Sequence, residues 1–134
     1  AFVGDGSFMM TGTAVATAVE YGIPAVWVVL NNRSVQFERR MKNIYGKEVF
    51  CDYRIERTGE PWNPDFVKMA EALGAEGLRL ERPEEIRPTL RKALKAGRPV
   101  VVEAEIDIDI EPYNPAPFAY TADFYDRGLK NPPF

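Results

Sequence analysis

The chain has 134 residues, of which 46% are hydrophobic, and its formal net charge at pH 7 is −3. This length and composition fit one domain with an apolar core, and the small acidic excess argues against nucleic acid as a partner. With one cysteine and no histidine, the chain can form no internal disulfide, zinc site or histidine-activated nucleophile. No apolar run reaches the roughly 18 residues of a membrane span, so we expect no membrane partner and a cytoplasmic location.

The first predicted strand covers residues 1–3 and runs into the glycine turn GDGS at positions 4–7. A helix over residues 8–21 should follow, ended by Gly22 and Pro24. Because the chain begins inside a strand, we expect it to be a fragment of a longer polypeptide. The expected buried face of the helix consists of small and apolar residues: Met10, Ala14, Val15, Ala18 and Val19.

The second predicted strand, residues 25–30 with the sequence AVWVVL, is continuously apolar and ends at Asn31-Asn32. Such a run is typical of a central parallel strand that is buried on both faces. A strand, a crossover helix and a second parallel strand bring both carboxyl ends to one edge of a sheet. We therefore expect Asp5 and Asn32 to lie close together.

The residue types at this edge indicate a metal-bridged diphosphate site. Gly4 and Gly6 allow a tight turn and a close approach of the backbone to a ligand, and Ser7 opens the helix. The carboxylate of Asp5 and the amide oxygen of Asn32 are hard ligands of the kind that suit Mg²⁺ or Ca²⁺. The alternative is that GDG is an ordinary turn and NN an ordinary strand end.

The rest of the chain predicts a long connection, two helices and two strands. Residues 45–61 show no clear period, and Asn63-Pro64-Asp65 is typical of a helix start with Asn63 as the cap. The expected apolar face of that helix consists of Phe66, Met69, Ala70 and Leu73. A strand over residues 77–80 follows it.

The second of these helices should cover residues 83–96, with Pro88 shifting its start or kinking it. We expect its inward side chains to be Ile86, Leu90, Ala93 and Leu94. The last strand covers residues 98–106, and Glu103 and Glu105 should face solvent or form salt bridges rather than bind a metal. Residues 107–134 are rich in proline and aromatic residues and predict an irregular, extended tail.

The GDGS turn, the spacer and the NN pair at the end of an apolar strand resemble the thiamine diphosphate fingerprint of the pyruvate decarboxylase and acetolactate synthase superfamily. The similarity is close from GDGSFMM to VVLNN and continues more loosely to about Asp109. It implies a fragment of a diphosphate-binding domain over residues 1–134. The fold class is then α/β, a partial doubly wound, Rossmann-like parallel sheet with helices on both faces.

The resemblance implies thiamine diphosphate and Mg²⁺ as cofactors. The implied metal ligands are Asp5, Asn32 and the backbone carbonyl of Ser34. The implied cofactor-binding residues are Gly4, Asp5, Gly6, Ser7, Asn32, Ser34 and Phe37. Family members shape their substrate pocket with the segment after the NN pair, so Phe37, Phe50 and Tyr53 are candidate lining residues, and the alternative for each is simple loop packing.

Glu38 is the candidate catalytic residue, because some decarboxylases of the family carry a proton-handling glutamate at this distance from the Asn pair. Such a role requires a carboxyl whose pKa is raised by burial. The alternative is that Glu38 lies on a solvated helix face beside Arg39 and Arg40.

The resemblance implies a carboligase like acetolactate synthase, which decarboxylates a 2-oxo acid and transfers the acyl unit. A simple 2-oxo acid decarboxylase and a non-catalytic domain with a degenerate site are the alternatives. A dinucleotide-binding domain is disfavoured because position 9 is Met, not the Gly of its fingerprint. Family members form homodimers or tetramers and use a glutamate on a separate pyrimidine-binding domain, so we expect the isolated chain to be inactive. Their first helix lies near the subunit interface, where many carry Glu in place of Ala14.

Overall fold

The computed structural model describes residues 1–35 and 52–107. Its centre is a sheet of four parallel strands in the order β1-β2-β4-β3. These strands are β1 (Phe2–Gly4), β2 (Val26–Asn31), β4 (Val100–Glu105) and β3 (Glu76–Leu80). The predicted α/β fold with a parallel sheet is confirmed.

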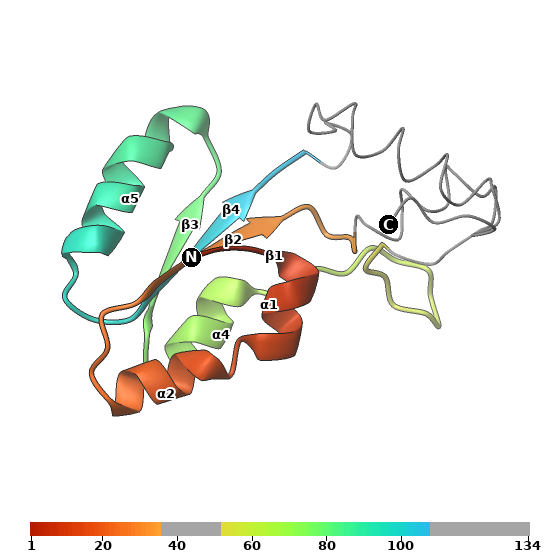
Figure 1. Ribbon diagram of the computed structural model, residues 1–134. Coiled ribbons are helices and arrows are strands. Elements are labelled where there is room, and N and C mark those ends of the chain that lie inside the picture. Colours follow the sequence, from red (N-terminus) through yellow and green to blue (C-terminus); the bar gives the residue numbers. More distant parts are fainter. Residues whose placement is uncertain (36–51, 108–134) are drawn as a thin grey trace, which may run out of the picture.

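Helices cover both faces of this sheet (Figure 1). On one face lie α1 (Asp5–Thr11), α2 (Ala14–Glu20) and α4 (Phe66–Ala72). On the other lies α5 (Ile86–Lys95), which follows the short 3₁₀ turn η1 (Pro83–Glu85). This layering is the predicted Rossmann-like arrangement.

Two apolar clusters hold the layers together, one on each face of the sheet. Between the sheet and α1, α2 and α4, the rings of Phe8 and Phe66 meet edge to face, with centroids 5.6 Å apart. Around them are buried Val15, Val29, Ala70, Ala75 and Val101. The cluster under α5 consists of Val28, Leu80, Ala93, Val100, Val102 and Ala104.

The predicted helix over residues 8–21 is wrong in detail, because the chain forms two short helices separated at Gly12 and Thr13. Gly12 lies directly against α4, where an added Cβ would come within 2.8 Å of the Met69 side chain. Because α1 ends at Thr11, Met10 and Val15 lie on different helices and do not share one buried face. Met10 is 78% exposed. Ala14, also predicted to be inward, is exposed.

Both later helices begin differently from the prediction. Asp65, not Asn63, caps α4, since its Oδ1 accepts a hydrogen bond from the Lys68 amide at 2.9 Å. In α5, Pro88 falls in the first turn, where a missing amide costs no helical hydrogen bond. The expected inward face of α5 is too wide, because Leu90 and Ala93 face the sheet while Ile86 and Leu94 are 46% and 75% exposed.

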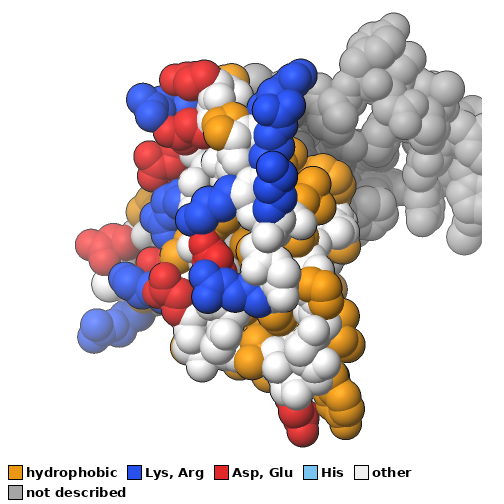
Figure 2. All heavy atoms as spheres, turned by 90° about the vertical axis from the view of Figure 1, so that its left-hand side faces the viewer, with side chains coloured by type: hydrophobic (Ala, Val, Ile, Leu, Met, Phe, Trp, Pro, Cys, Tyr) orange, Lys and Arg blue, Asp and Glu red, His pale blue; other side chains and the backbone are white. Residues whose placement is uncertain are grey.

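Charges of both signs are interspersed on the face that carries α5 (Figure 2). Glu76 at the start of β3 binds Lys92 of α5 at 2.9 Å and Arg98 at 2.7 Å, so this pairing joins three parts of the fold. In residues 1–35 and 52–107, no helix has the length and apolarity that crossing a bilayer requires.

Candidate functional site

The parallel pairing of β1 and β2 creates a site at their carboxyl ends. Gly4 pairs with Leu30 in the register of the two strands, so the residues after each strand emerge side by side. Asp5 is the first residue of α1, and Asn32 follows the last residue of β2. The crossover therefore brings together two polar side chains that are distant in the sequence, as predicted.

Asp5 is a buried carboxylate, with 3% of its surface exposed. Its Oδ1 accepts a hydrogen bond from the Gly6 amide at 2.8 Å, and its Oδ2 accepts one from the Ser34 amide at 3.2 Å. Burial raises the pKa of Asp5 above 3.8, and the backbone donors oppose that rise. Among the described residues, no Lys or Arg forms a salt bridge with it.

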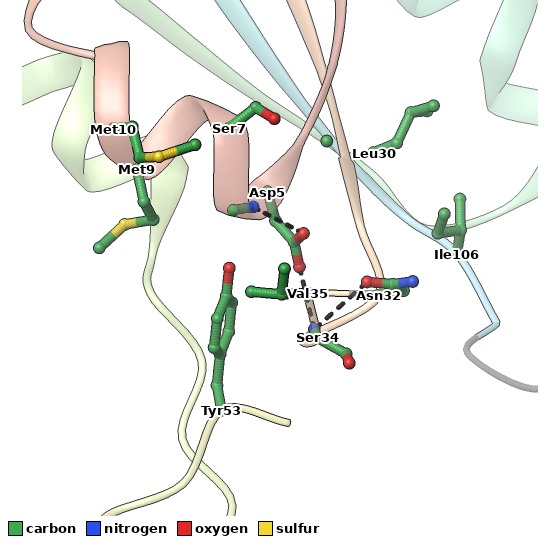
Figure 3. A pocket seen from close by; sticks show the side chains of 12 residues that line it. Asp5, Ser7, Met9, Met10, Leu30, Asn32, Ser34, Val35, Tyr53 and Ile106 are labelled. Atoms are coloured by element: carbon green, nitrogen blue, oxygen red, sulfur yellow. Dashed lines mark hydrogen bonds between the residues drawn. The ribbon is translucent and has the colours of Figure 1, made fainter. Parts of the chain in front are cut away.

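The turn after β2 is held by the side chains of its own two asparagines. Arg33 has a φ of 60°, a left-handed conformation that is uncommon for a residue other than glycine. Its amide donates to Asn31 Oδ1 at 3.1 Å, and the Ser34 amide donates to Asn32 Oδ1 at 3.2 Å. These bonds fold the turn back so that Ser34 reaches Asp5 (Figure 3).

A cavity of about 570 Å³ opens in front of this turn. Figure 3 shows the side chains of Asp5, Asn32 and Tyr53 around it, with Met9 and Met10 of α1 at one side. The other lining residues are Gly4, Gly6, Ser7, Leu30, Ser34, Val35 and Ile106. Two buried hydroxyls in this wall, Ser34 Oγ and Tyr53 Oη, have no hydrogen-bond partner among the residues that the structure describes.

Tyr53 reaches the site from the loop that follows Asp52. The Tyr53 amide donates to the Arg33 carbonyl at 2.9 Å, and its ring lies 6.0 Å from that of Trp62. Burial, with a smaller contribution from the charge of Asp5, raises the Tyr53 pKa to about 12. A Cβ on Gly6 would lie 3.4 Å from Tyr53 Oη, so a glycine there leaves the hydroxyl room beside the turn.

The structure brings six of the predicted site residues to this one cavity: Gly4, Asp5, Gly6, Ser7, Asn32 and Ser34. Phe37, Glu38 and Phe50 lie outside the described residues. In this structure the Gly6 amide, expected to face a diphosphate, donates to Asp5. Sequence reasoning missed Asn31, whose side chain binds the turn, because an asparagine that ends an apolar strand gives no sign of which way it faces.

The donor set fits a hard cation together with an anionic oxygen ligand. A carboxylate buried without a cationic side chain is costly, and Mg²⁺ takes one or two carboxylates plus phosphate oxygens. The two unpaired hydroxyls in the wall would gain partners from such a ligand. Within the described residues, no group of three or more His, Cys, Asp or Glu side chains forms another metal site.

The family model for the thiamine pyrophosphate enzyme, C-terminal TPP binding domain, matches residues 1–104. The mitochondrial acetolactate synthase catalytic subunit of Saccharomyces cerevisiae is 36% identical over 104 residues, 78% of this chain and 14% of that protein. An acetolactate synthase of Mycobacterium avium is 35% identical over 109 residues, 81% of this chain and 17% of that protein.

A solved structure, the thiamine diphosphate-dependent 4-hydroxybenzoylformate decarboxylase of Rhodococcus jostii RHA1, superposes with a TM-score of 0.70 and 30% sequence identity. The match covers 81% of this chain and 19% of that one. The chain thus spans less than a fifth of the length of these relatives. By its family match and its fold, the chain belongs to the C-terminal TPP-binding domains of the thiamine pyrophosphate enzymes.

Proposed function

We propose that this chain is the diphosphate- and Mg²⁺-binding part of an enzyme that decarboxylates a 2-oxo acid and joins the acyl unit to an acceptor, as an acetolactate synthase-like carboligase. The observation that carries the proposal is the convergence of Asp5, Asn32 and Ser34 on one cavity, in a chain of this family. When bound, thiamine diphosphate supplies the carbanion chemistry, and the protein positions it.

The proposal divides the cavity into a cation site, a diphosphate site and apolar walls. Asp5, Asn32 and the Ser34 carbonyl would hold the cation, which would supply positive charge to the buried carboxylate and the diphosphate. Gly4, Gly6 and Ser7, which line the cavity at the start of α1, would hold the diphosphate. Apolar side chains on the other walls, among them Val35 and Ile106, keep water away from the bound cofactor.

Three residues outside the described part of the chain complete the proposal. Phe37 would contact the cofactor, Glu38 would donate or accept a proton with its carboxyl group, and Phe50 would line the substrate pocket. A pyrimidine-binding domain, either in the same polypeptide or in the other subunit of a homodimer or tetramer, supplies the glutamate that activates the cofactor. A cytoplasmic location remains a prediction.

The carboligase is preferred to a simple decarboxylase because the relatives in yeast and in Mycobacterium avium both carry the name acetolactate synthase. The decarboxylase is the second candidate, since the superposed structure from Rhodococcus has that name. A degenerate, non-catalytic site is the third. It is disfavoured because Asp5 and Asn32 are both present and converge on the Ser34 amide.

The test is a product analysis of the full-length protein with thiamine diphosphate, Mg²⁺ and pyruvate as the probe 2-oxo acid. A carboligase releases one CO₂ for each pair of pyruvate molecules that it joins, and forms the branched hydroxy-oxo acid. A decarboxylase releases one CO₂ and one free aldehyde for each pyruvate. No CO₂ from any of a panel of 2-oxo acids, with no cofactor binding, would contradict the proposal.

A further inference from the structure

A network of polar groups around one buried carboxylate lies next to the turn that carries Asn32. Its centre is Glu103 on β4, a carboxylate with only 1% of its surface exposed. Asn31 donates its side-chain amide to Glu103 Oε1 at 2.7 Å, and Arg79 of β3 donates to Glu103 Oε2 at 3.1 Å. The carboxylate thus meets one donor at each oxygen. Such an arrangement is what allows a charge to be buried.

The contacts of Asn31 fix which way its amide points. Its Nδ2 donates both to Glu103 and to the side-chain oxygen of Asn63, the latter at 3.0 Å. Its Oδ1 therefore faces the turn and accepts the Arg33 amide. In the flipped orientation the amide oxygen would face the carboxylate and the NH₂ group would face another N–H donor, so both contacts would become repulsive.

We propose that Glu103 is a positioning residue for the cofactor site, acting through the Asn31 amide on the turn that presents Ser34 to Asp5 and Asn32. The left-handed backbone conformation of Arg33 is strained, so it needs surrounding contacts to hold it in place. The Glu103 charge orients Asn31, and Asn31 holds the Arg33 amide in that conformation. Cation binding by this turn rests on the proposed function, whereas the orientation of the turn by Glu103 is independent of it.

A carboxylate is required at this position because two donors face it. Arg79, which also binds Asp65 at 3.0 Å, and Asn31 approach different oxygens. A glutamine has one acceptor oxygen, so its NH₂ group must face one of the two donors or force Asn31 to flip. The change Glu103→Gln keeps the shape of the side chain but leaves one acceptor oxygen in place of two.

The experiment measures amide hydrogen exchange at Arg33 and Ser34 in the full-length protein without ligands. We expect Glu103→Gln to speed exchange at both amides by about tenfold, the effect of losing one well-made hydrogen bond. Glu105→Gln is the matched control. It removes the same charge from the same strand and touches the same turn, through an exposed ion pair with the Arg33 side chain at 3.0 Å. The control should exchange at the wild-type rate.

A double variant tests the pairing directly. Asn31→Asp alone places two carboxylates together and should also speed exchange. Combined with Glu103→Gln, the introduced glutamine can donate to the introduced aspartate and accept from Arg79, while the second aspartate oxygen accepts the Arg33 amide. Asn63, which accepts from Asn31 in the wild type, can turn its side-chain amide and donate to the aspartate. We expect the double variant to regain most of the protection that each single variant loses.

Titration with Mg²⁺ and thiamine diphosphate gives the second readout. We expect Glu103→Gln to weaken Mg²⁺-dependent cofactor binding by about tenfold, the lower end of what losing an outer-shell partner costs, because Glu103 acts on the turn only through Asn31. If wild-type protein binds no cofactor, the proposed function fails while the exchange result still tests the role of Glu103.

Wild-type exchange at both amides in folded Glu103→Gln would overturn the inference. If Glu103→Gln does not fold, fast exchange of the Arg33 and Ser34 amides in a folded double variant would overturn the inference.

Discussion

The carboxylate of Asp5 and the side-chain oxygen of Asn32 accept hydrogen bonds from one and the same donor, the Ser34 amide, each at 3.2 Å. Two oxygens that come from different strands therefore converge on one point at the sheet edge (Figure 3). A backbone N–H offers only a partial positive charge, so it compensates the buried carboxylate weakly. A divalent cation beside the same two oxygens would compensate it fully.

Tyr53→Phe should have opposite effects on stability and on binding. The Tyr53 hydroxyl is buried and has no partner within residues 1–35 and 52–107, so removing it should raise the free energy of unfolding of the ligand-free protein by about 1 kcal/mol. Cofactor affinity should fall by about tenfold if the hydroxyl donates to the bound ligand. Thermal unfolding and a binding titration measure the two effects. Tyr21→Phe, at a residue that is 71% exposed, is the control and should change neither.

Glu76→Gln should destabilise the protein in a pH-dependent way. Hydrogen bonds from Lys92 and then Arg98 lower the pKa of Glu76 below its ordinary 4.5. A lowered folded-state pKa means that the stabilisation is fully present above about pH 4.5 and is lost as the pH falls through the folded value. The variant should lose about 1 kcal/mol at pH 7, and the difference from wild type should shrink at lower pH.

Chemical denaturation of both proteins between pH 7 and the acid limit of folding measures this difference. A difference that stays the same across that range would contradict the assigned ion pairs.

Gly77→Ala should destabilise the fold by about 1–3 kcal/mol through overpacking. An added Cβ at Gly77 would lie 2.8 Å from the Val67 carbonyl oxygen and 3.0 Å from its Cα, so β3 and α4 would have to separate. At Gly4 an added Cβ meets nothing within 4 Å, so Gly4→Ala serves as the control. Denaturation curves measure both variants. Equal stability of the two would mean that β3 does not lie against α4 as described.

The meeting of Asp5 and Asn32 could be predicted from the sequence because parallel topology alone determines it. A strand, a crossover helix and a strand return the chain to the same edge whatever the details of the helix. The break at Gly12 could not be predicted, because the close contact of Gly12 with Met69 of α4 joins residues that are distant in the sequence. The capping role of Asp65 could not be predicted either, since Asn63 has the same local preference for a helix start. In the structure the Asn63 side chain instead accepts a hydrogen bond from Asn31.

The position of Glu103 shows where a local pattern is insufficient. Its alternation with apolar neighbours predicts solvent or a salt bridge, and the salt bridge to Arg79 is confirmed. Its burial could not be read from the strand, because the partners that compensate its charge lie on β3 and at the end of β2. Glu105 matches the prediction, with an exposed ion pair to Arg33.

Calorimetric titration of thiamine diphosphate into the full-length protein, with Mg²⁺ or with a chelator, tests the central claim most directly. Wild type and the Glu105→Gln control should bind the cofactor with Mg²⁺ and lose binding with the chelator. Asp5→Asn keeps the side-chain shape and removes the charge, so affinity should fall by more than the roughly 100-fold that losing an outer-shell partner costs. Wild-type affinity and Mg²⁺ dependence in folded Asp5→Asn would contradict the account.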